Sequence, residues 1–569
     1  MFGKSQFTWM IRPACKAVVT GLTMVMLLVA GLLYGQGGGH CVVHLDKPFY
    51  VNGEVVWYKL YLPPQFAGRE RMIEVNVLDD AGEVLETHYR HSAGETFVDG
   101  YYKVPFDCRT GLYQLVFSGM RRELGANVLL AQAEVAFYND FDIIDPALIV
   151  ASAPGRPAAD AALSGDKVQV RVDVSPSISA RAEQEIRITL TDAAGQPVTG
   201  HVSVSVVDHQ MVPEPVLVRG PDMSYGVVEE QMSDNIFVKG VVRDLQGNPI
   251  QVNVLGAFSP AENKVQYSKS DKSGIFSLAM PDFYGKKAIQ FVGFQQEVDA
   301  LAAEVIHEVP AQPSTNSVTF THEIIDYLAL SRKRKKIFQY FTALEQNLEI
   351  ARHEMDRRVF KPDFTYRIAE YEDFDVVRDF FGELITPLKF RQVDTTWVAT
   401  MENPKGRNIQ ETHLAGPPLF IVDGKLTRNA DFIARMDMSP IETIELFYDP
   451  YKLRDYFNAI GRSGVVRITT KLPDAPFPHH DARNIWEING LLSEAEFPAI
   501  TAREYDDAPY PLIRSQLYWD PAVTTDGQGV AVIHVPQSDD LTTFRITVLA
   551  QAASGARGYG RTTYVVGSR

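Results

Sequence analysis

Five times along the chain an Asp is followed three residues later by a Gly, between apolar, β-branched stretches. The pairs are Asp79–Gly82, Asp192–Gly195, Asp244–Gly247, Asp271–Gly274 and Asp526–Gly529. An Asp side chain can accept hydrogen bonds from the backbone that follows it, and Gly adopts positive φ freely, so each pair predicts a tight turn. The flanking stretches alternate between apolar and polar residues, as strands do. We therefore predict a chain of β-rich modules in which at least four of the five pairs form hairpins.

The length sets the number of modules. A chain of 569 residues is expected to contain about three to five domains, each with its own core. Aromatic residues make up 11% of the chain, and together with the alternating patterns they exclude general disorder.

The first 35 residues have the features of a signal peptide. Lys4, Arg12 and Lys16 precede or border an uncharged apolar run over 17–33, and a cut before Gln36 is expected. An uncleaved membrane anchor is the alternative, since the run is close to the shortest span that crosses a bilayer. Lipidation at Cys41 is a weaker interpretation, because the Leu and small residues of a lipoprotein signal do not precede it.

The charge disfavours polyanionic partners. A net charge of −16 argues against nucleic acid and anionic lipid. The one basic run, residues 332–336, lies between apolar segments with helical spacing, so a solvated helix face is favoured over a polyanion site.

Two cysteines remain after the leader, Cys41 and Cys108, both in the first predicted module. They could form a disulfide in an oxidising compartment, but the sequence does not show that they approach each other. The later modules contain no cysteine, which excludes thiol catalysis and Cys-rich metal sites there.

A motif near the start of the mature chain is the most specific local pattern. Its residues are Asp46, Lys47, Pro48, Tyr50, Gly53 and Glu54. This pattern resembles the opening of the macroglobulin-type domain of the alpha-2-macroglobulin family. The resemblance implies a β-sandwich over 36–145, with further strands expected at 72–78, 84–91, 97–104, 112–118 and 127–138.

Two more modules follow a linker predicted over 146–166. The hairpin around Asp192 resembles the macroglobulin family again and predicts a second sandwich over 167–230. The strands and turns around Asp244 and Asp271 resemble a carboxypeptidase regulatory-like domain, a transthyretin-like sandwich that we place at 234–310. That domain is non-catalytic in its family, so no peptidase activity follows.

The next segment changes pattern. Apolar residues at helical spacing predict a helical connector over 318–400. The strands at 401–473 then resemble the plug domain of TonB-dependent outer-membrane receptors, on Asp423, Gly424, Ile441, Glu442 and Gly464. A receptor barrel needs about twenty-two strands, and only about one hundred residues follow, so this plug-like domain has no barrel within the chain.

The C-terminal region completes the predicted organisation. A linker is expected over 474–505 and a β module over 506–569. Trp519 and Pro521 open a Trp-x-Pro strand that resembles another macroglobulin-family segment, and Trp519 is interpreted as a core residue.

The chain shows no catalytic, cofactor-binding or metal-binding pattern. The pairs His322-Glu323 and His353-Glu354 each lack the second His that a zinc metalloprotease helix requires. The pair His479-His480 is interpreted as solvated loop residues. The Cys-Gly-Glu-Gln string of thioester-containing macroglobulins is absent, which excludes covalent protease trapping.

We predict a mainly β, multi-domain chain of Ig-like and transthyretin-like β-sandwiches with one small α+β plug-like domain. The expected function is that of a non-enzymatic, exported protein, in the periplasm or at the outer membrane of a Gram-negative cell. It would bind protein or peptide partners, with no cofactor and no nucleic acid, and peripheral membrane association is compatible with this. One version is an accessory to a TonB-dependent transport system docking on an outer-membrane barrel; the alternative is a non-covalent macroglobulin-like endopeptidase inhibitor.

Overall fold

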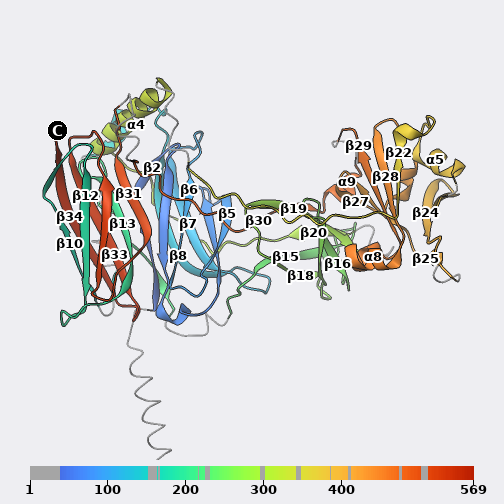
Figure 1. The fold of residues 1–569 in the computed structure, drawn as a ribbon, viewed down its shortest axis with the longest axis horizontal. Coiled ribbons are helices and arrows are strands. Elements are labelled where there is room, and N and C mark those ends of the chain that lie inside the picture. Colours follow the sequence, from blue (N-terminus) through green and yellow to red (C-terminus); the bar gives the residue numbers. More distant parts are fainter. Residues whose placement is uncertain are drawn as a thin grey trace, which may run out of the picture.

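The computed structural model describes residues 39–568 except 151–162, 164–166, 216, 224–230, 295–300, 315, 341–347, 385, 408–411, 473–476 and 502–510. The signal peptide predicted over 1–35 lies outside the described residues, as does most of the linker at 146–166. The described chain is mainly β and forms four units arranged end to end (Figure 1). Among the residues described, no helix combines the length and apolarity needed to cross a membrane.

The first sandwich contains two sheets, with strand orders β14-β1-β3-β6 and β2-β8-β7-β4-β5. Its strands are β1 (His40–Leu45), β2 (Phe49–Val51), β3 (Val55–Tyr61), β4 (Met72–Leu78), β5 (Val84–His91), β6 (Phe97–Lys103), β7 (Gly111–Gly119), β8 (Val128–Tyr138) and β14 (Val218–Asp222). The five strands expected between 72 and 138 coincide with β4 to β8. Strand β14 comes from the stretch assigned to the second module and pairs with β1 instead.

Both cysteines are free and buried in the core of the first sandwich. The sulfur of Cys41 lies 3.6 Å from the sulfur of Met223. Burial raises the pKa of Cys41 to about 12 and that of Cys108 to about 11. The two thiols therefore behave as small apolar core groups, and the structure contains no bond between them.

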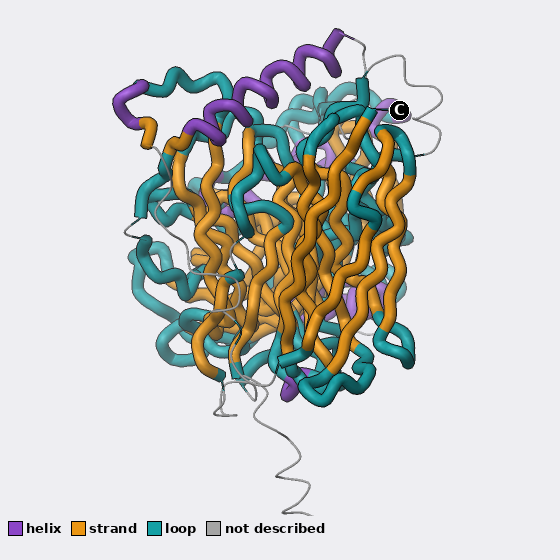
Figure 2. The backbone as a smooth tube through the Cα atoms, turned by 90° about the vertical axis from the view of Figure 1, so that its left-hand side faces the viewer, coloured by secondary structure: helices purple, strands orange, loops and turns teal. Residues whose placement is uncertain are grey.

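The second sandwich is built from two segments far apart in the sequence. Its sheets have the orders β10-β12-β32 and β11-β34-β33-β13-β31. The strands are β10 (Gln169–Val174), β11 (Ser177–Ser179), β12 (Glu183–Thr191), β13 (Gly200–Asp208), β31 (Gln516–Thr524), β32 (Val530–Pro536), β33 (Thr543–Ala552) and β34 (Arg557–Gly567). The modules predicted separately at 167–230 and 506–569 thus share one core, which includes Ile186, Val204 and Phe544. Figure 2 shows these strands side by side.

The third unit is a smaller sandwich with sheets β18-β15-β20 and β17-β16-β19-β30. Its strands are β15 (Ile236–Arg243), β16 (Leu255–Ser259), β17 (Lys264–Ser268), β18 (Ile275–Met280), β19 (Lys286–Gly293), β20 (Ala302–Val305) and β30 (Ile485–Asn489). Strand β30 falls in the stretch predicted as a linker over 474–505, yet it pairs with β19 along its whole length.

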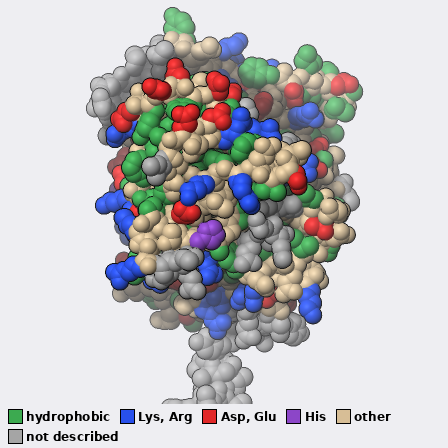
Figure 3. Space-filling view, turned by 90° about the vertical axis from the view of Figure 1, so that its right-hand side faces the viewer, with side chains coloured by type: hydrophobic (Ala, Val, Ile, Leu, Met, Phe, Trp, Pro, Cys, Tyr) green, Lys and Arg blue, Asp and Glu red, His purple; other side chains and the backbone are tan. Residues whose placement is uncertain are grey.

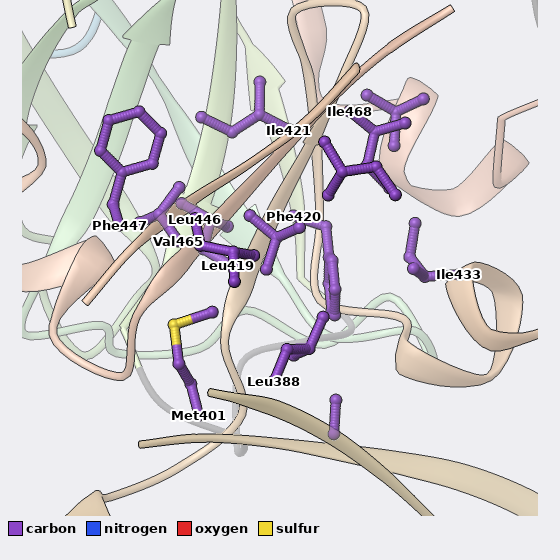
Figure 4. Packing of buried hydrophobic residues seen from close by; sticks show 14 of the residues in the cluster. Leu388, Met401, Leu419, Phe420, Ile421, Ile433, Leu446, Phe447, Val465 and Ile468 are labelled. Carbon is purple, nitrogen blue, oxygen red and sulfur yellow. The ribbon is translucent and has the colours of Figure 1, made fainter. Parts of the chain in front are cut away.

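The fourth unit contains the segment predicted over 401–473, is called the plug-like unit after that prediction, and forms the other end of the molecule (Figure 1). Its main sheet has the order β22-β28-β29-β26-β27, beside a small sheet β23-β24-β25. The elements are β22 (Phe364–Arg367), α5 (Val377–Glu383), β23 (Leu388–Val393), β24 (Thr396–Glu402), β25 (His413–Leu414), β26 (Leu419–Val422), β27 (Lys425–Thr427), α7 (Ala430–Ala434), β28 (Ile441–Phe447), α8 (Pro450–Tyr456) and β29 (Val465–Thr470). The two sheets and α7 contribute to one apolar core (Figure 4). Strands β22 and β23 and most of β24 lie within the segment predicted as a helical connector, so that prediction is wrong there.

The remaining elements lie outside the sheets of the four units. Helix α4 (His322–Tyr340) lies across one end of the two large sandwiches (Figures 1 and 2). The others are the strands β9 (Ile149–Val150) and β21 (Phe320–Thr321), the helix α9 (His479–Ala482), and the 3-10 turns η1 (Pro64–Phe66), η2 (Pro146–Leu148), η4 (Ile368–Glu370) and η5 (Asn458–Gly461).

The chain path is nested. The third unit and the plug-like unit both lie between β13 and β31 in the sequence, and the plug-like unit lies between β20 and β30. The second and third units therefore each close only after the inserted segment has returned.

All five Asp-x-x-Gly pairs are tight turns with positive φ at Gly, as predicted. In the first, the Asp79 carboxylate accepts hydrogen bonds from the N–H groups of Ala81 and Glu83. Only this pair joins two strands that are neighbours in one sheet, β4 and β5. The other four make a local bridge or turn and then send the chain into the opposite sheet of a sandwich, so the predicted hairpins are wrong at these positions. The turn residues dictate the reversal of direction, whereas the partner of each strand depends on distant parts of the chain.

Candidate functional site

The motif of residues 46–54 forms the connection between β1 and β3, which includes β2 and is held by a buried carboxylate. Asp46 accepts a hydrogen bond from the Tyr50 hydroxyl at 2.5 Å and another from the backbone N–H of Trp57 at 2.8 Å. Burial raises the pKa of Asp46 to about 6, although Lys47 and these donors oppose the shift. The carboxylate therefore fixes the backbone of the turn.

Glu54 is the centre of an ion-paired network. It accepts the backbone N–H of Val51, and it pairs with Lys47 at 2.7 Å and with Arg334 at 3.4 Å. Burial alone would raise the pKa of Glu54, but the charges of Lys47 and Arg334 lower it to about 2. Glu54 is thus ionised throughout the physiological range and binds two cations from different elements.

Helix α4 is attached to this network by its buried face. The hydroxyl of Tyr327 lies 2.7 Å from both Glu54 and Ser515. Arg334 donates to Ser515 at 2.8 Å, and Lys335 pairs with the buried Asp140 at 2.8 Å. Two residues of the basic run are therefore joined to the first sandwich and to the segment before β31. Arg332, Lys333 and Lys336 are exposed, as the prediction of a solvated helix face requires.

The same region joins the two large sandwiches. The hydroxyl of Ser205 on β13 donates to the backbone carbonyl of Asp46 at 2.8 Å. His44 Nδ1 lies 2.6 Å from the hydroxyl of Ser203, and the Tyr61 hydroxyl donates to the carbonyl of Leu549. The motif is therefore a three-way joint between the first sandwich, α4 and the second sandwich.

A cleft of about 120 Å³ opens at this joint. Its walls come from the turn before β3, the end of β6, α4 and residues 513–516. The lining includes five cationic side chains, namely Lys47, Lys103, Arg334, Lys335 and Arg514, and one carboxylate, Glu54. The lining also includes the aromatic side chains of Trp57, Phe106 and Phe497. Gly53, with φ +85°, leaves the space that the Phe106 ring occupies.

The residues of the plug-like motif shape that unit rather than a second cleft. Asp423 and Gly424 both have positive φ and form the two-residue turn between β26 and β27. The Asp423 carboxylate accepts hydrogen bonds from the N–H and hydroxyl of Thr470. Ile441 is buried, Glu442 is exposed, and Gly464, with φ +95°, approaches Met401 too closely for any side chain.

Trp519 and Pro521 belong to the interface between the large sandwiches. Trp519 is 3% exposed and clusters with Trp57 and Tyr101, so it is a core residue as predicted. Its ring lies edge-on to His44 at 5.2 Å. Pro521 coincides with a register shift between β31 and β13, where a residue without an N–H breaks no ladder bond.

None of the histidine pairs lines the cleft. His353 stacks on Tyr284 and bonds Glu494 at 3.1 Å, and His322 begins α4. The pair His479-His480 lies in the short helix α9. Within the part of the chain that the structure describes, no three His, Cys, Asp or Glu side chains are grouped to hold a metal ion.

The sequence pattern indicated only one side of the site. Residues 46–54 were selected by the motif, whereas Lys103, Phe106 and Arg514 carry no local signal. Helical spacing indicated a helix in the segment that contains α4, and the basic run at 332–336 indicated that this helix has anions nearby, since five adjacent cations in an acidic chain need them. The convergence itself depends on contacts between residues almost 470 positions apart.

No protein-family model and no curated protein matches the chain. Among solved structures, similarity is found to alpha-2-macroglobulin of Salmonella reacted with methylamine, with 9% identity over 94% of this chain and 40% of that one, at a TM-score of 0.23. Trypsin-activated alpha-2-macroglobulin of Escherichia coli matches with 9% identity over 94% of this chain and 42% of that one, at 0.24. A tetra-tandem repeat from the extending region of a large adhesion protein matches at a TM-score of 0.13, with 9% identity over 92% of this chain and 99% of that one.

The chain spans less than half the length of these alpha-2-macroglobulins. TM-scores this low do not establish a shared overall fold. The strands themselves define the class of protein, which is a mainly β chain of sandwiches with one α+β unit.

Proposed function

We propose that this chain is a non-enzymatic, exported envelope protein that binds a protein or peptide partner at the cleft between its two large sandwiches. The observation that carries the proposal is the composition of that cleft. It is open to solvent and combines cationic and aromatic side chains, which is how protein surfaces recognise charged segments of other proteins. Its lining contains no histidine or cysteine, and the Ser515 hydroxyl contacts Tyr327 and Arg334 rather than a base.

The charged motif residues support a binding role for a second reason. The charged groups of Asp46, Lys47 and Glu54 make bonds that hold three elements of the protein together. A catalytic acid or base needs a proton that is free to move to a substrate, and these groups instead make hydrogen bonds and ion pairs within the joint. We therefore infer that the motif residues have a structural role and that the cleft they support is the binding surface.

Two narrower versions of the proposal differ in the partner. In the first, the plug-like unit contacts a separate outer-membrane barrel as part of a TonB-dependent system. In its support, this unit lies at the end of the molecule opposite the second sandwich and presents interspersed acidic and basic side chains (Figures 1 and 3). In the second, the partner is an endopeptidase that the chain inhibits without a covalent bond.

Photo-crosslinking in intact cells tests the proposal. A photoreactive residue replaces the exposed Phe106 at the cleft, the 80% exposed Tyr451 of the plug-like unit, or, as a control, the 59% exposed Leu245 on a turn of the third unit. We expect a defined envelope protein to crosslink at Phe106 and not at Leu245, and to rebind in purified form. A barrel protein captured at Tyr451 would support the accessory version.

Titration of purified endopeptidases with the protein tests the inhibitor version of the proposal. A stoichiometric loss of protease activity would identify an inhibitor. Absence of any crosslinked partner at both Phe106 and Tyr451 would overturn the binding proposal. Turnover of a substrate that is lost on substitution of cleft residues would replace it with an enzymatic function.

A further inference from the structure

The cleft has a charge opposite to that of the whole chain. The protein carries a net charge of −16, yet five cations and one carboxylate line this small opening. Two more carboxylates lie close behind the wall, where Asp140 pairs with Lys335 and Asp540 binds the backbone N–H of Arg514. Cations still outnumber anions with these included. Like charges held together in a partly desolvated site repel, so the arrangement is stabilised when an anion enters.

The carboxylates present are already occupied. Glu54 forms ion pairs with Lys47 at 2.7 Å and with Arg334 at 3.4 Å. Asp140 accepts a hydrogen bond from the Ser331 hydroxyl and pairs with Lys335. Lys103 is exposed at the end of β6, opposite Val55, and makes no ion pair with any residue that the structure describes. It therefore leaves the cleft with a cation available to a ligand.

The aromatic wall restricts the kind of anion. Trp57 and Phe497 contact each other with ring centroids 5.9 Å apart, and the Phe106 ring is 46% exposed. A bare inorganic anion would leave this apolar surface in water, whereas a carboxylate attached to an apolar side chain would cover it. The volume of about 120 Å³ is also smaller than the roughly 300–1,000 Å³ of pockets that enclose a whole small molecule. It suits one residue of a longer chain.

We propose that the cleft binds the carboxylate end of a peptide whose last side chain is apolar, with Lys103 holding the carboxylate and Phe106 covering the side chain. This rests on the proposed binding function and specifies its ligand. Cationic side chains give strong, charge-assisted hydrogen bonds to carboxylates, and the aromatic contact adds apolar burial.

The test uses the purified protein and the acetylated peptide Ala-Ala-Ala-Leu-Phe, with either a free carboxylate or a C-terminal amide, followed by calorimetry. We expect the free acid to bind and the amide to bind at least tenfold more weakly. Because an exposed charge pair contributes up to about 1 kcal/mol, reversal of the charge in Lys103→Glu should weaken binding roughly five- to twentyfold. Lys103→Arg should retain it. Raising the salt concentration should weaken the free acid further.

A matched control is Lys272→Glu, a charge reversal on an exposed turn of the third unit, which should leave the affinity unchanged. Equal binding of acid and amide, or no effect of Lys103→Glu, would overturn the proposal. So would binding of inorganic phosphate without binding of the peptide. Crosslinking of a partner at Phe106 that survives Lys103→Glu would leave the binding function intact and reject this ligand. Binding of the free acid without any cellular partner at Phe106 or Tyr451 would support this ligand and overturn the proposed binding function.

Discussion

Lys59 is a buried lysine without a hydrogen-bond or ion-pair partner among the described residues, and it weakens the structure that contains it. Its side chain is 0% exposed, and its amino group lies 4.4 Å and 4.1 Å from the centres of the Tyr61 and Phe97 rings. The Nζ atom has no hydrogen-bond partner among the described residues. Burial lowers the pKa of Lys59 to about 7. Removing a charge from water without a partner costs several kcal/mol, so the group is retained at the expense of stability.

We therefore expect Lys59→Met to raise the free energy of unfolding at pH 7 by about 2 kcal/mol. Because the pKa of Lys59 is lower in the folded state, the unfolded state binds more protons between about pH 7 and 10.5, and wild-type stability should rise with pH across that range. Lys59→Met should lose this slope. Urea unfolding at pH 6, 7 and 9 measures both effects, with the exposed Lys103→Met as the control. A variant less stable than wild type, with the slope retained, would contradict this account.

Gly53 and Gly82 form a matched pair, since both adopt nearly the same positive φ. Their φ angles are +85° and +84°. A Cβ at Gly53 would lie 2.6 Å from the Phe106 ring, whereas a Cβ at Gly82 would meet nothing within 4 Å. Gly82→Ala should cost about 1 kcal/mol of backbone strain, and Gly53→Ala about 1–3 kcal/mol more because it must also displace Phe106. Equal shifts in the urea midpoint of the two variants would show that Phe106 is not held by Gly53.

At the scale of elements, the strands of the second sandwich depend on each other across the inserted units. Strand β12 pairs with β32, and β13 lies between β31 and β33. A variant ending at residue 501 would lose β31 to β34 and expose the apolar faces of β12 and β13 to water. We expect it to lack a cooperative transition for residues 167–208, and limited proteolysis with mass spectrometry should show cleavage there.

The plug-like unit, in contrast, should be removable without unfolding the sandwiches, because all strands of its main sheet come from residues 364–470. Replacing that segment by a Gly-Ser linker should leave the sandwiches folded and protected, at the cost of the contact that Phe258 makes with the plug-like core. Two outcomes would contradict the strand pairing. One is protection of residues 167–208 from proteolysis in the variant that ends at residue 501. The other is loss of that protection in the variant whose residues 364–470 are replaced by a linker.

These elements also show what sequence can and cannot predict. Turn chemistry is local, so Asp192 and Gly195 predicted a reversal that is present. Strand periodicity is also local, so β4 to β8 were predicted nearly to the residue. The pairing of β12 with β32 joins residues more than 340 positions apart, and no local pattern distinguishes it from a hairpin with β13. For the same reason Glu54 was predicted as a motif residue, but its partner Arg334 was not.

At the scale of the whole molecule, the nested path requires the chain to return from the third unit to the first. The described residues of the segment, 306–314 and 316–319, make this return. Gln312 exchanges two hydrogen bonds with Gln132 of β8, and the N–H of Ile306 donates to the carbonyl of Lys239 of β15. His307 of this segment lies 3.2 Å from Glu74, which is wholly buried in the first sandwich. This ion pair links the return segment to the first sandwich, and its strength depends on pH because both partners can titrate.

The pH dependence of this link follows from two pKa shifts. Burial alone would lower the pKa of His307, but its hydrogen bond to Glu74 and the charge of Glu74 raise it. Burial alone would raise the pKa of Glu74, but His307, Asn76 and Lys239 lower it. The histidine contribution is fully present below about pH 6.5 and is lost as the pH rises through the raised value. The carboxylate contribution is present above about pH 4.5 and is lost as the pH falls through the lowered value. The pair therefore stabilises the link most between about pH 4.5 and 6.5.

We expect His307→Gln to destabilise the protein clearly at pH 5.5 and much less at pH 8.5, because glutamine can still bond Glu74 but carries no charge to match it. Thermal unfolding of both proteins at the two pH values measures the difference. His413→Gln serves as the control, since His413 is exposed on β25 and should give no pH-dependent difference. If the His307 variant lost equal stability at both pH values, the residue would act through shape alone. A larger loss at pH 8.5 would reverse the sign of the linkage and refute the ion pair as the source of the coupling between the two units.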